Sequence, residues 1–264
     1  MLFRSVAEYT RQQTGPDWLP TVGAAVAREL DVPGERLYLK QRRTGGDDGP
    51  RYGRLADVGT RFVVRERDLR FWVNLTDRLD TGLFSDHRDT RRIVRDLSRG
   101  TDFLNLYAYT GTFTCAAVLG GAKTTVTVDR SATYCDWVQD NLALNGLAGP
   151  RHERIQADTL AFLERAAQET RRWDLVVVDP PSFSQDRGPG VGFDIQRDHP
   201  DLLARVLAVT APGGTVFFST NHQRFEPRMD ELPVASRVEL TPDSIPPDYR
   251  NRRVHRCWRL VKPA

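Results

Sequence analysis

The sequence of 264 residues predicts an α/β fold: a mostly parallel sheet covered by helices, with a small N-terminal α+β appendage. Two observations predict the sheet. From about residue 85, apolar runs alternate with segments of helical periodicity, which is typical of βαβ units. One run, Trp173-Asp-Leu-Val-Val-Val178, is apolar on both faces, as a central parallel strand is. A third observation, the period-two pattern before residue 80, predicts the appendage.

The appendage is expected over residues 1–80, with antiparallel strands, and the sheet domain over residues 81–264. In the appendage, Leu69, Phe71 and Val73 share one face, which is typical of a half-exposed strand. Its expected elements are a helix at 18–30, strands at 37–41, 62–66 and 69–75, and a Gly- and Asp-rich loop at 44–50.

The sheet domain is expected to contain five parallel strands followed by closing strands, one of them antiparallel. The expected strands are 103–107, 124–128, 154–157, 173–178 and 215–219, with closing strands at 237–240 and 255–261. The expected helices begin near Thr112 and cover 131–145, 159–168 and 200–209. The second of these ends at Asn145-Gly146, a favourable C-terminal cap.

Composition limits the class of protein. With 39% hydrophobic and 28% charged residues, the chain is predicted to be globular, and no apolar run is long enough to cross a membrane. The first ten residues lack the pattern of a secretory signal. Three cysteines match neither a disulfide framework nor a metal-binding spacing, so we expect no metal and a cytoplasmic location.

Arginine is concentrated in two segments, residues 36–54 and the tail from residue 248, although the net charge is only +3. Because arginine binds phosphate through two parallel hydrogen bonds, the clusters are consistent with a nucleic-acid surface. A solvated Arg-rich surface explains the clusters equally well, and charge alone does not decide between this interpretation and a nucleic-acid surface.

The loop after the first strand of the sheet, Asn105-Leu-Tyr-Ala-Tyr-Thr-Gly111, contains a single glycine. A nicotinamide site needs the more open G-x-G-x-x-G turn to admit a pyrophosphate. S-adenosylmethionine has no phosphate and can lie along a bulkier loop, where Asn105, Tyr107 or Thr110 would bond its methionine end. Alternatively, Gly111 serves only the turn from strand to helix.

Acidic residues follow two further strands. Asp129 lies where an acid ending the second strand accepts hydrogen bonds from both ribose hydroxyls, and Asp158 ends the third strand and could accept from the adenine amine. Each could instead cap the helix that follows it. Their recurrence at successive strand ends favours the cofactor.

The segment Asp179-Pro-Pro-Ser-Phe183 is the most specific pattern in the chain. Two prolines fix the backbone and remove N–H donors, so that carbonyl oxygens can face a ligand. Phe183 is placed to stack on a planar base. Upstream, Arg88 could bind the cofactor carboxylate, and Phe84 or His87 could line the pocket, with no proton transfer expected of His87.

Carbon methylation of a pyrimidine requires a nucleophile, for which the cysteines are the candidates. Cys115 and Cys135 lie in predicted helices, and Cys257 lies in a late strand that we expect to be away from the cofactor loops. None is expected to attack a base.

At these residues the chain resembles the bacterial 23S rRNA guanine-N7 methyltransferases of the RlmK type, the C-terminal half of the RlmKL fusion enzymes. The likeness runs through nearly the whole chain. Its landmarks include Leu37-Tyr-Leu-Lys40, Trp72-Val-Asn-Leu-Thr-Asp77, Leu79-Asp-Thr-Gly-Leu-Phe84, Asp86-His-Arg88, Tyr109-Thr-Gly111, Thr127-Val-Asp129, Asp179-Pro-Pro-Ser-Phe183 and Asn251-Arg-Arg-Val-His-Arg-Cys-Trp258.

The resemblance implies a Rossmann-like class I methyltransferase sheet that binds S-adenosylmethionine and acts on 23S rRNA or its precursor. The appendage would then contact RNA. The implied cofactor-binding residues are Phe84, Asp86, Arg88, Asn105, Tyr107, Tyr109, Thr110, Gly111, Asp129, Arg130, Asp158, Thr159 and Asp179. The catalytic loop is Asp179, Pro180, Pro181 and Phe183, and Phe183, Arg197 and Asn221 are expected to bind the base.

The family's fused half, with its RNA-binding THUMP domain, has no counterpart in this sequence, and the segment leading into the catalytic half is expected to be shorter. This leaves room for a separate RNA-binding protein as partner. Two alternatives remain: a cytosine-C5 methyltransferase of the RlmI type, which shares the Tyr-Thr-Gly and Asp-Pro-Pro loops, and a cofactor-free RNA-binding module.

Overall fold

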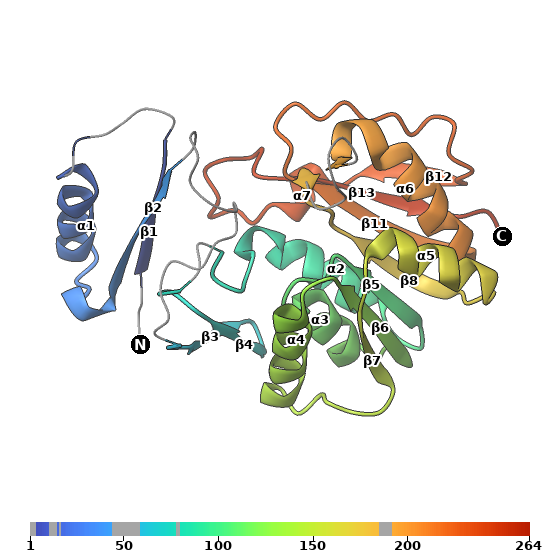
Figure 1. Cartoon of the computed structure of the whole chain (residues 1–264), viewed down its shortest axis with the longest axis horizontal. Coiled ribbons are helices and arrows are strands. Elements are labelled where there is room, and N and C mark those ends of the chain that lie inside the picture. Colours follow the sequence, from blue (N-terminus) through green and yellow to red (C-terminus); the bar gives the residue numbers. More distant parts are fainter. Residues whose placement is uncertain (1–3, 11–14, 16, 44–58, 78–79, 185–191) are drawn as a thin grey trace. The chain divides into compact units, whose positions relative to one another are not determined.

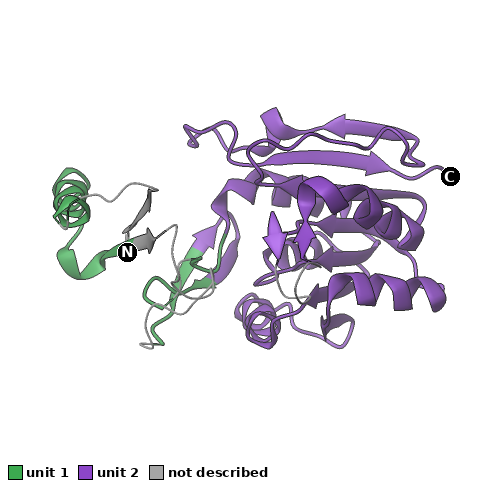
Figure 2. Cartoon of the chain, turned by 45° about the horizontal axis from the view of Figure 1, so that its top comes forward, with its two compact units in different colours: residues 1–64, 72–83 green, residues 65–71, 84–264 purple. Residues whose placement is uncertain are grey.

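A computed structural model describes residues 4–10, 15, 17–43, 59–77, 80–184 and 192–264. The predicted loop at 44–50 lies outside these residues. The chain divides into two compact units, shown in different colours in Figure 2: residues 1–64 with 72–83, and residues 65–71 with 84–264. The second unit therefore includes the tip of a hairpin formed by β3 (Phe62–Glu66) and β4 (Leu69–Val73). The expected boundary at residue 80 placed the whole hairpin in the appendage.

The first unit contains a parallel pair of strands. β1 (Arg4–Thr10) pairs with β2 (Leu37–Arg43), and the helix α1 (Trp18–Glu29) connects them. Antiparallel strands were predicted for residues 1–80, whereas this pair is parallel. A strand before the helix, which the sequence reading missed, makes a crossover connection, and a helical crossover returns the chain in the parallel sense.

The second unit is built on a seven-stranded sheet (Figure 1). Its order is β12 (Ser236–Glu239), β13 (Arg256–Val261), β11 (Thr210–Thr220), β8 (Trp173–Val178), β5 (Asp102–Leu106), β6 (Thr124–Asp129) and β7 (His152–Gln156). Strands β11, β8, β5, β6 and β7 pair in parallel, and β13 is antiparallel to both of its neighbours. This is the predicted Rossmann-like sheet with an antiparallel closing strand.

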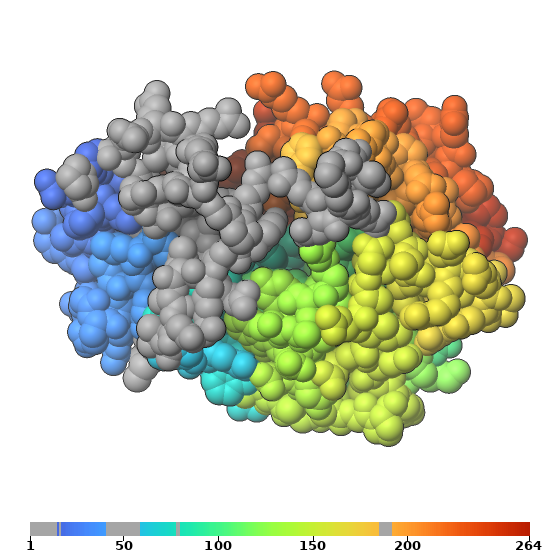
Figure 3. Space-filling model, viewed as in Figure 1, coloured from blue at the N-terminus to red at the C-terminus, as the bar shows by residue number. Residues whose placement is uncertain are grey.

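Helices cover both faces of this sheet, and the alternation of side chains along β5 separates the two cores. Leu104 and Leu106 pack with α5 (Thr159–Gln168) and α6 (Ile195–Val209), whereas Phe103 packs with α2 (Arg88–Leu97) and α3 (Thr112–Leu119). Helix α4 (Ala132–Leu144) contacts β6 and β7. In the space-filling view of Figure 3, the described residues from 84 onward are coloured from teal through green and yellow to red.

Helix α6 begins at Ile195, five residues before the predicted start, and Pro200 lies inside it. A proline in a helix leaves the carbonyl four residues earlier without its N–H partner. Here the guanidinium of Arg228 donates to the carbonyl oxygens of Gln196 and Arg197, each at 2.8 Å. A side chain distant in sequence thus satisfies the oxygen that the proline frees.

The remaining elements are short: the 3-10 turns η1 (Gly34–Arg36) and η2 (Ser85–His87), the strands β9 (Phe183–Ser184) and β10 (Phe193–Asp194), and helix α7 (Thr241–Ser244). Within the described residues, no helix has the length and apolar character needed to cross a membrane.

Candidate functional site

Three strands of the second unit end at one edge of the sheet, where the predicted site residues follow them. β5 leads into residues 107–111, β6 ends at Asp129, and β8 leads into Asp179. Neighbouring parallel strands present their carboxyl ends at the same edge, and in open α/β sheets this is where ligands bind. The sheet order therefore brings together acids that are 50 residues apart in the chain.

The loop after β5 turns through an unusual backbone conformation. Tyr107, Tyr109 and Gly111 have φ angles of 54°, 51° and 73°, in the left-handed region. Residues other than glycine enter this region at a cost of about 1–2 kcal/mol each. The hydrogen bond from the Tyr109 N–H to Oδ2 of Asp129, at 2.8 Å, stabilises the loop against that cost.

Gly111 is required by space as well as by conformation. A Cβ atom at this position would lie 2.8 Å from both methyl groups of Val138 in α4. The next residue begins α3, and the carbonyl oxygen of Thr110 accepts a hydrogen bond from the Asn141 amide at 2.9 Å. Loop and helices are therefore packed together at the point where the cofactor is expected.

Asp129 is 9% exposed, and its two oxygens accept backbone N–H groups from Tyr109 and Ser131. Burial raises the pKa of Asp129 above its ordinary value despite these bonds. A carboxylate has about four lone-pair directions, so it can accept from these N–H groups and from the ribose hydroxyls of a ligand.

Aromatic rings lie beside this loop. The ring centroids of Phe84 and Tyr109 are 5.1 Å apart, and those of Tyr109 and Tyr134 are 4.6 Å apart. Phe84 is 43% exposed, which is uncommon for a phenylalanine that already contacts another ring. This exposed surface suits a flat apolar ligand group such as adenine.

Some predicted cofactor residues are not at the loop surface. Asn105 shares the face of β5 that carries Phe103; it is 1% exposed, and its amide donates to Thr114 of α3 at 3.0 Å. The pleat of the strand turns this side chain beneath α3, and its assignment to the methionine end of the cofactor stays a prediction. Thr110, another of these predicted residues, is fully buried.

Other predicted cofactor residues are engaged elsewhere. Oδ1 of Asp158 accepts the N–H groups of Leu160 and Ala161 as the N-cap of α5, and the neighbouring Thr159 is buried. The guanidinium of Arg88 forms an ion pair with Asp248 instead of remaining open for a cofactor carboxylate. The capping role, which the sequence left open for Asp158, is the one that the structure displays.

The loop after β8 is held in place from the neighbouring strand. Oδ1 of Asp179 accepts a hydrogen bond from the Ser219 hydroxyl at 2.6 Å, near the end of β11. Pro180 is buried and Pro181 half-buried, and Phe183 presents a ring that is 44% exposed. The hydroxyl of Ser182 donates to Oδ1 of Asn221 at 2.7 Å, so the two predicted base-binding regions meet.

Two predicted arginines lie near this loop. Arg130 donates to the Ser184 hydroxyl at 3.3 Å. Arg197 is exposed and binds the carboxylate of its neighbour Asp198, with N–O distances of 2.6 and 2.8 Å. Contact between Arg197 and a base would therefore require exchange of this ion pair.

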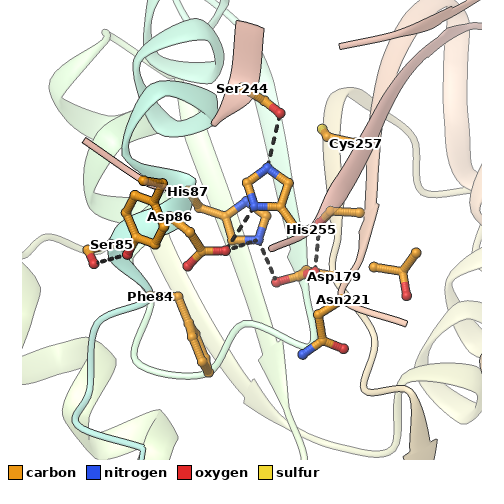
Figure 4. Close-up of polar contacts among 12 residues, drawn as sticks. Phe84, Ser85, Asp86, His87, Asp179, Asn221, Ser244, His255 and Cys257 are labelled. Carbon is orange, nitrogen blue, oxygen red and sulfur yellow. Dashed lines mark hydrogen bonds and ion pairs between the residues drawn. The ribbon is translucent and has the colours of Figure 1, made fainter. Parts of the chain in front are cut away.

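The sequence reading missed a buried polar cluster next to Asp179 (Figure 4). Oδ2 of Asp86 accepts from Nδ1 of His255 at 2.8 Å, and Nε2 of His255 lies 3.0 Å from the Ser244 hydroxyl. Nε2 of His87 lies 3.7 Å from Oδ2 of Asp179 and 3.8 Å from Oδ2 of Asp86. The matched segments Asp86-His-Arg88 and Asn251–Trp258 contained these residues, but nothing local showed that they meet.

Burial opposes charge throughout this cluster. It lowers the pKa of His87, so the ring is neutral at physiological pH. Burial alone would raise the pKa of Asp86, but the hydrogen bond from His255 and further contacts in the cluster lower it to about 2. The cluster therefore holds an ionised Asp86 beside a neutral His87.

Asp86, His87 and His255 together are a conceivable metal site, since their ligand atoms lie within 4.8 Å of one another. The rings of His87 and His255, however, are stacked 4.1 Å apart at an angle of 11°. A metal ion lies in the plane of each imidazole that binds it, at about 2.1 Å from the nitrogen. Parallel, separated ring planes have no such point in common, so the observed geometry does not fit a metal.

Cys257 lies closer to this edge than its position in a late strand predicted. It pairs with Ser219 across β11 and β13, and the charge of Asp179 acts on its thiol. It is fully buried, and burial together with the neighbouring carboxylates raises its pKa far above the ordinary value. The thiol is therefore neutral and inaccessible at physiological pH.

A second buried ion pair, Arg91 with Glu66, lies next to the backbone of Phe84. Arg91 is 2% exposed and binds both oxygens of Glu66, and it also donates to the Phe84 carbonyl oxygen at 2.9 Å. Glu66 stands at the hairpin tip that belongs to the second unit. No periodic signal marks such a pair, since its partners are 25 residues apart.

Similar folds occur among solved structures. The crystal structure of SMU.776, a complex with SAH, matches with a TM-score of 0.74 at 22% identity, over 92% of this chain and 66% of that one. The crystal structure of the M. jannaschii tRNA m1G37 methyltransferase matches with a TM-score of 0.61 at 12% identity, over 100% of this chain and 74% of that one. At these identities the likeness shows the fold.

Sequence relatives are closer. Proteins named ribosomal RNA large subunit methyltransferase K/L from Methylococcus capsulatus and Allochromatium vinosum are each 46% identical, over 91% and 89% of this chain. The chain spans about a third of their length, 32% in both cases. The predicted resemblance to the K/L type is confirmed by these relatives.

The family of S-adenosylmethionine-dependent methyltransferases matches residues 27–236, which include the loop after β5, Asp129 and Asp179. Its cofactor agrees with the single-glycine loop and the strand-end acid. The chain belongs to the S-adenosylmethionine-dependent methyltransferases.

Proposed function

We propose that this chain transfers the methyl group of S-adenosylmethionine to N7 of a guanine in large-subunit ribosomal RNA. The observation that carries the proposal is the Asp179 loop, where an exposed aromatic ring and an oriented amide lie beside a strand-end carboxylate. The names of the relatives that are 46% identical support the RNA substrate.

The residues present fit the cofactor. Asp129 would accept the ribose hydroxyls, the backbone of the loop after β5 would lie along the methionine part, and Phe84 with Tyr109 would contact the adenine. The group supplies an electrophilic methyl carbon on a sulfonium. Asp129 needs no rearrangement for its role, because two backbone N–H groups already orient its carboxylate.

Guanine N7 carries a lone pair in the ring plane and no proton, so the reaction needs no general base. The contribution of the protein is alignment of N7 with the methyl carbon and the sulfur, and such positioning can supply most of the rate. The ring gains positive charge as the methyl group arrives. The Asp179 carboxylate and the carbonyl oxygens of the two prolines would stabilise that charge.

The base must leave its stack to reach this edge of the sheet. In paired RNA the N7 edge lies in a deep, narrow groove that side chains cannot enter. Phe183 offers an exposed ring for stacking. Because Oδ1 of Asn221 accepts from Ser182, its NH₂ group faces away from that serine and would donate to O6, the acceptor beside N7.

Cytosine C5 methylation is the second candidate, favoured by the shared Tyr-Thr-Gly and Asp-Pro-Pro loops. That chemistry needs an accessible thiolate close to the base. Cys257 has the position but not the accessibility, since it is fully buried and its thiol is neutral. The guanine assignment is therefore preferred.

Transfer of a labelled methyl group into deproteinised large-subunit RNA, followed by nucleoside mass spectrometry, tests the proposal. We expect 7-methylguanosine. 5-Methylcytidine would instead support the cytosine candidate. Transfer only after addition of a cell fraction would point to a separate RNA-binding partner for this chain.

A further inference from the structure

Two segments of the second unit place polar side chains beside the carboxylate of Asp179, and further polar residues lie next to one of them (Figure 4). Ser219 of β11 donates to one oxygen, and His87 of η2 faces the other. Next to His87, Nδ1 of His255 donates to Asp86, and Nε2 of His255 lies 3.0 Å from the hydroxyl of Ser244 in α7. These contacts link side chains that are distant in the sequence.

The position of His87 determines where its proton lies. Its Nε2 faces two carboxylate oxygens, Oδ2 of Asp179 at 3.7 Å and Oδ2 of Asp86 at 3.8 Å. A lone pair at Nε2 would repel both, whereas an N–H at Nε2 attracts both. The opposite nitrogen, Nδ1, is buried and has no hydrogen-bond partner among the described residues. The neutral ring therefore carries its hydrogen on Nε2.

We infer that His87 is a positioning residue: its Nε2–H, 3.7 Å from Oδ2 of Asp179, attracts this oxygen electrostatically, while the Ser219 hydroxyl donates a hydrogen bond to Oδ1. Together the two groups restrict the orientation of the carboxylate beside the methyl-acceptor base. The ring of His255 stacks on the imidazole of His87, and the hydrogen bond from His255 to Asp86 holds that stacked ring in place. The inference rests on the proposed role of Asp179 and adds the device that orients it.

The state of the cluster fits this role. Burial keeps His87 neutral, so it can donate one hydrogen without placing a second positive charge beside the sulfonium of the cofactor. The groups that face His87 are Asp179, Asp86, His255 and Arg91. The ionised Asp86 favours the Nε2–H form, because the hydrogen of that form points toward it.

The first experiment measures the tautomer on the intact protein. The chain has five histidines, so a spectrum of protein with ¹⁵N-labelled histidine can be assigned by comparing the wild type with His87→Gln. We expect His87 to be the Nε2–H tautomer, and Asp179→Asn to shift this resonance without moving His152. An Nδ1–H tautomer, or no response to Asp179→Asn, would overturn the inference whatever the enzyme methylates.

The second experiment compares two variants of similar size. His87→Gln can place an amide N–H near the position of Nε2, whereas His87→Leu cannot donate. At 3.7 Å the contact is longer than a hydrogen bond, so its loss corresponds to about a 2- to 10-fold effect. We expect His87→Leu to lower kcat for methyl transfer by this factor, with the Kd for S-adenosylmethionine little changed, and His87→Gln to retain most of the activity.

His152→Gln, on β7, is the matched control and should leave both quantities unchanged. Equal loss in the leucine and glutamine variants, with both proteins folded by circular dichroism, would show that the ring itself matters and would refute a donor role. If His87→Leu does not fold, Ser219→Ala gives the same test at the other oxygen. One equivalent of tightly bound metal per chain, measured by elemental analysis, would overturn the positioning role in favour of a metal site.

Discussion

Asp129→Asn separates the two roles that the structure gives to this carboxylate. The two side chains have the same shape, but asparagine replaces one oxygen by an NH₂ group. Both oxygens accept a backbone N–H in the wild type, from Tyr109 at 2.8 Å and Ser131 at 2.9 Å. In either orientation, the amide NH₂ of the variant faces one of these donors, which then loses its acceptor.

The magnitude follows from these contacts. An unsatisfied buried N–H costs about 1–3 kcal/mol. For a chain of this size, 1 kcal/mol corresponds to roughly 2–4 °C in the midpoint of thermal unfolding. If the NH₂ group faces Tyr109, the left-handed conformation there also loses its support. We therefore expect a stability loss of about 1–3 kcal/mol, and a larger effect on the cofactor, because the ribose loses an acceptor as well.

Calorimetric titration with S-adenosylmethionine and thermal unfolding measure the two effects on the same sample. Weakening of about 10- to 100-fold in Kd is expected, the size of one hydrogen bond to a charged group. Asp136→Asn is the control, because Asp136 lies in α4, its side chain is 82% exposed, and its change should stay within about 0.5 kcal/mol. Unchanged Kd and unchanged unfolding midpoint in Asp129→Asn would refute the reasoning.

Three further predictions address the loop, the cluster and the cysteine. Gly111→Ala should destabilise the fold by about 1–3 kcal/mol in chemical denaturation, because its Cβ would lie 2.8 Å from Val138 at a φ of 73°. An unchanged midpoint of unfolding would contradict this, since it would mean that α4 shifts to make room for the methyl group. Asp86 has a lowered pKa of about 2 against an ordinary 3.8, so its contribution of roughly 2 kcal/mol is present above pH 4 and lost as the pH falls toward 2. Urea unfolding of wild type and Asp86→Asn should therefore differ at pH 5 and converge at pH 2, and an equal difference at both pH values would contradict the ionised, paired Asp86. Cys257→Ser should keep appreciable methyl transfer, measured with labelled cofactor, because a buried neutral thiol contributes no nucleophile; an inactive but folded variant would point to cytosine chemistry.

The sheet of the second unit was predictable because its signals are local. Strands that are apolar on both faces, such as β8, and helices with one apolar face are encoded within ten or fifteen consecutive residues. The start of α6 was not predictable, since Pro200 is tolerated only because Arg228 satisfies the carbonyl oxygens. The prediction missed β1, and with it the parallel pairing of β1 and β2. The direction in which two strands pair depends on the elements that lie between them in the chain.

The burial of Asn105 beneath α3 is a feature that the sequence could have predicted. Leu104 and Leu106 face one core and Phe103 faces the other, so Asn105 must share the side of Phe103. Side chains in a strand alternate with period two, and parity alone places this amide beneath α3 rather than in the loop. The acids Asp129 and Asp179 differ from Asn105 because they stand where their strands end.

No local sequence pattern shows how the side chains of Asp129 and Asp179 are held in place. Asp129 is oriented in part by the backbone N–H of Tyr109, 20 residues earlier, and Asp179 by Ser219, 40 residues later. Asp86 and His255, 169 residues apart, complete the support behind His87. A carboxylate can be assigned to a site from its place at a strand end, but its orientation depends on donors that only the fold brings together. Substitutions at these donors should therefore alter the rate of methyl transfer while leaving the residues that touch the ligand unchanged.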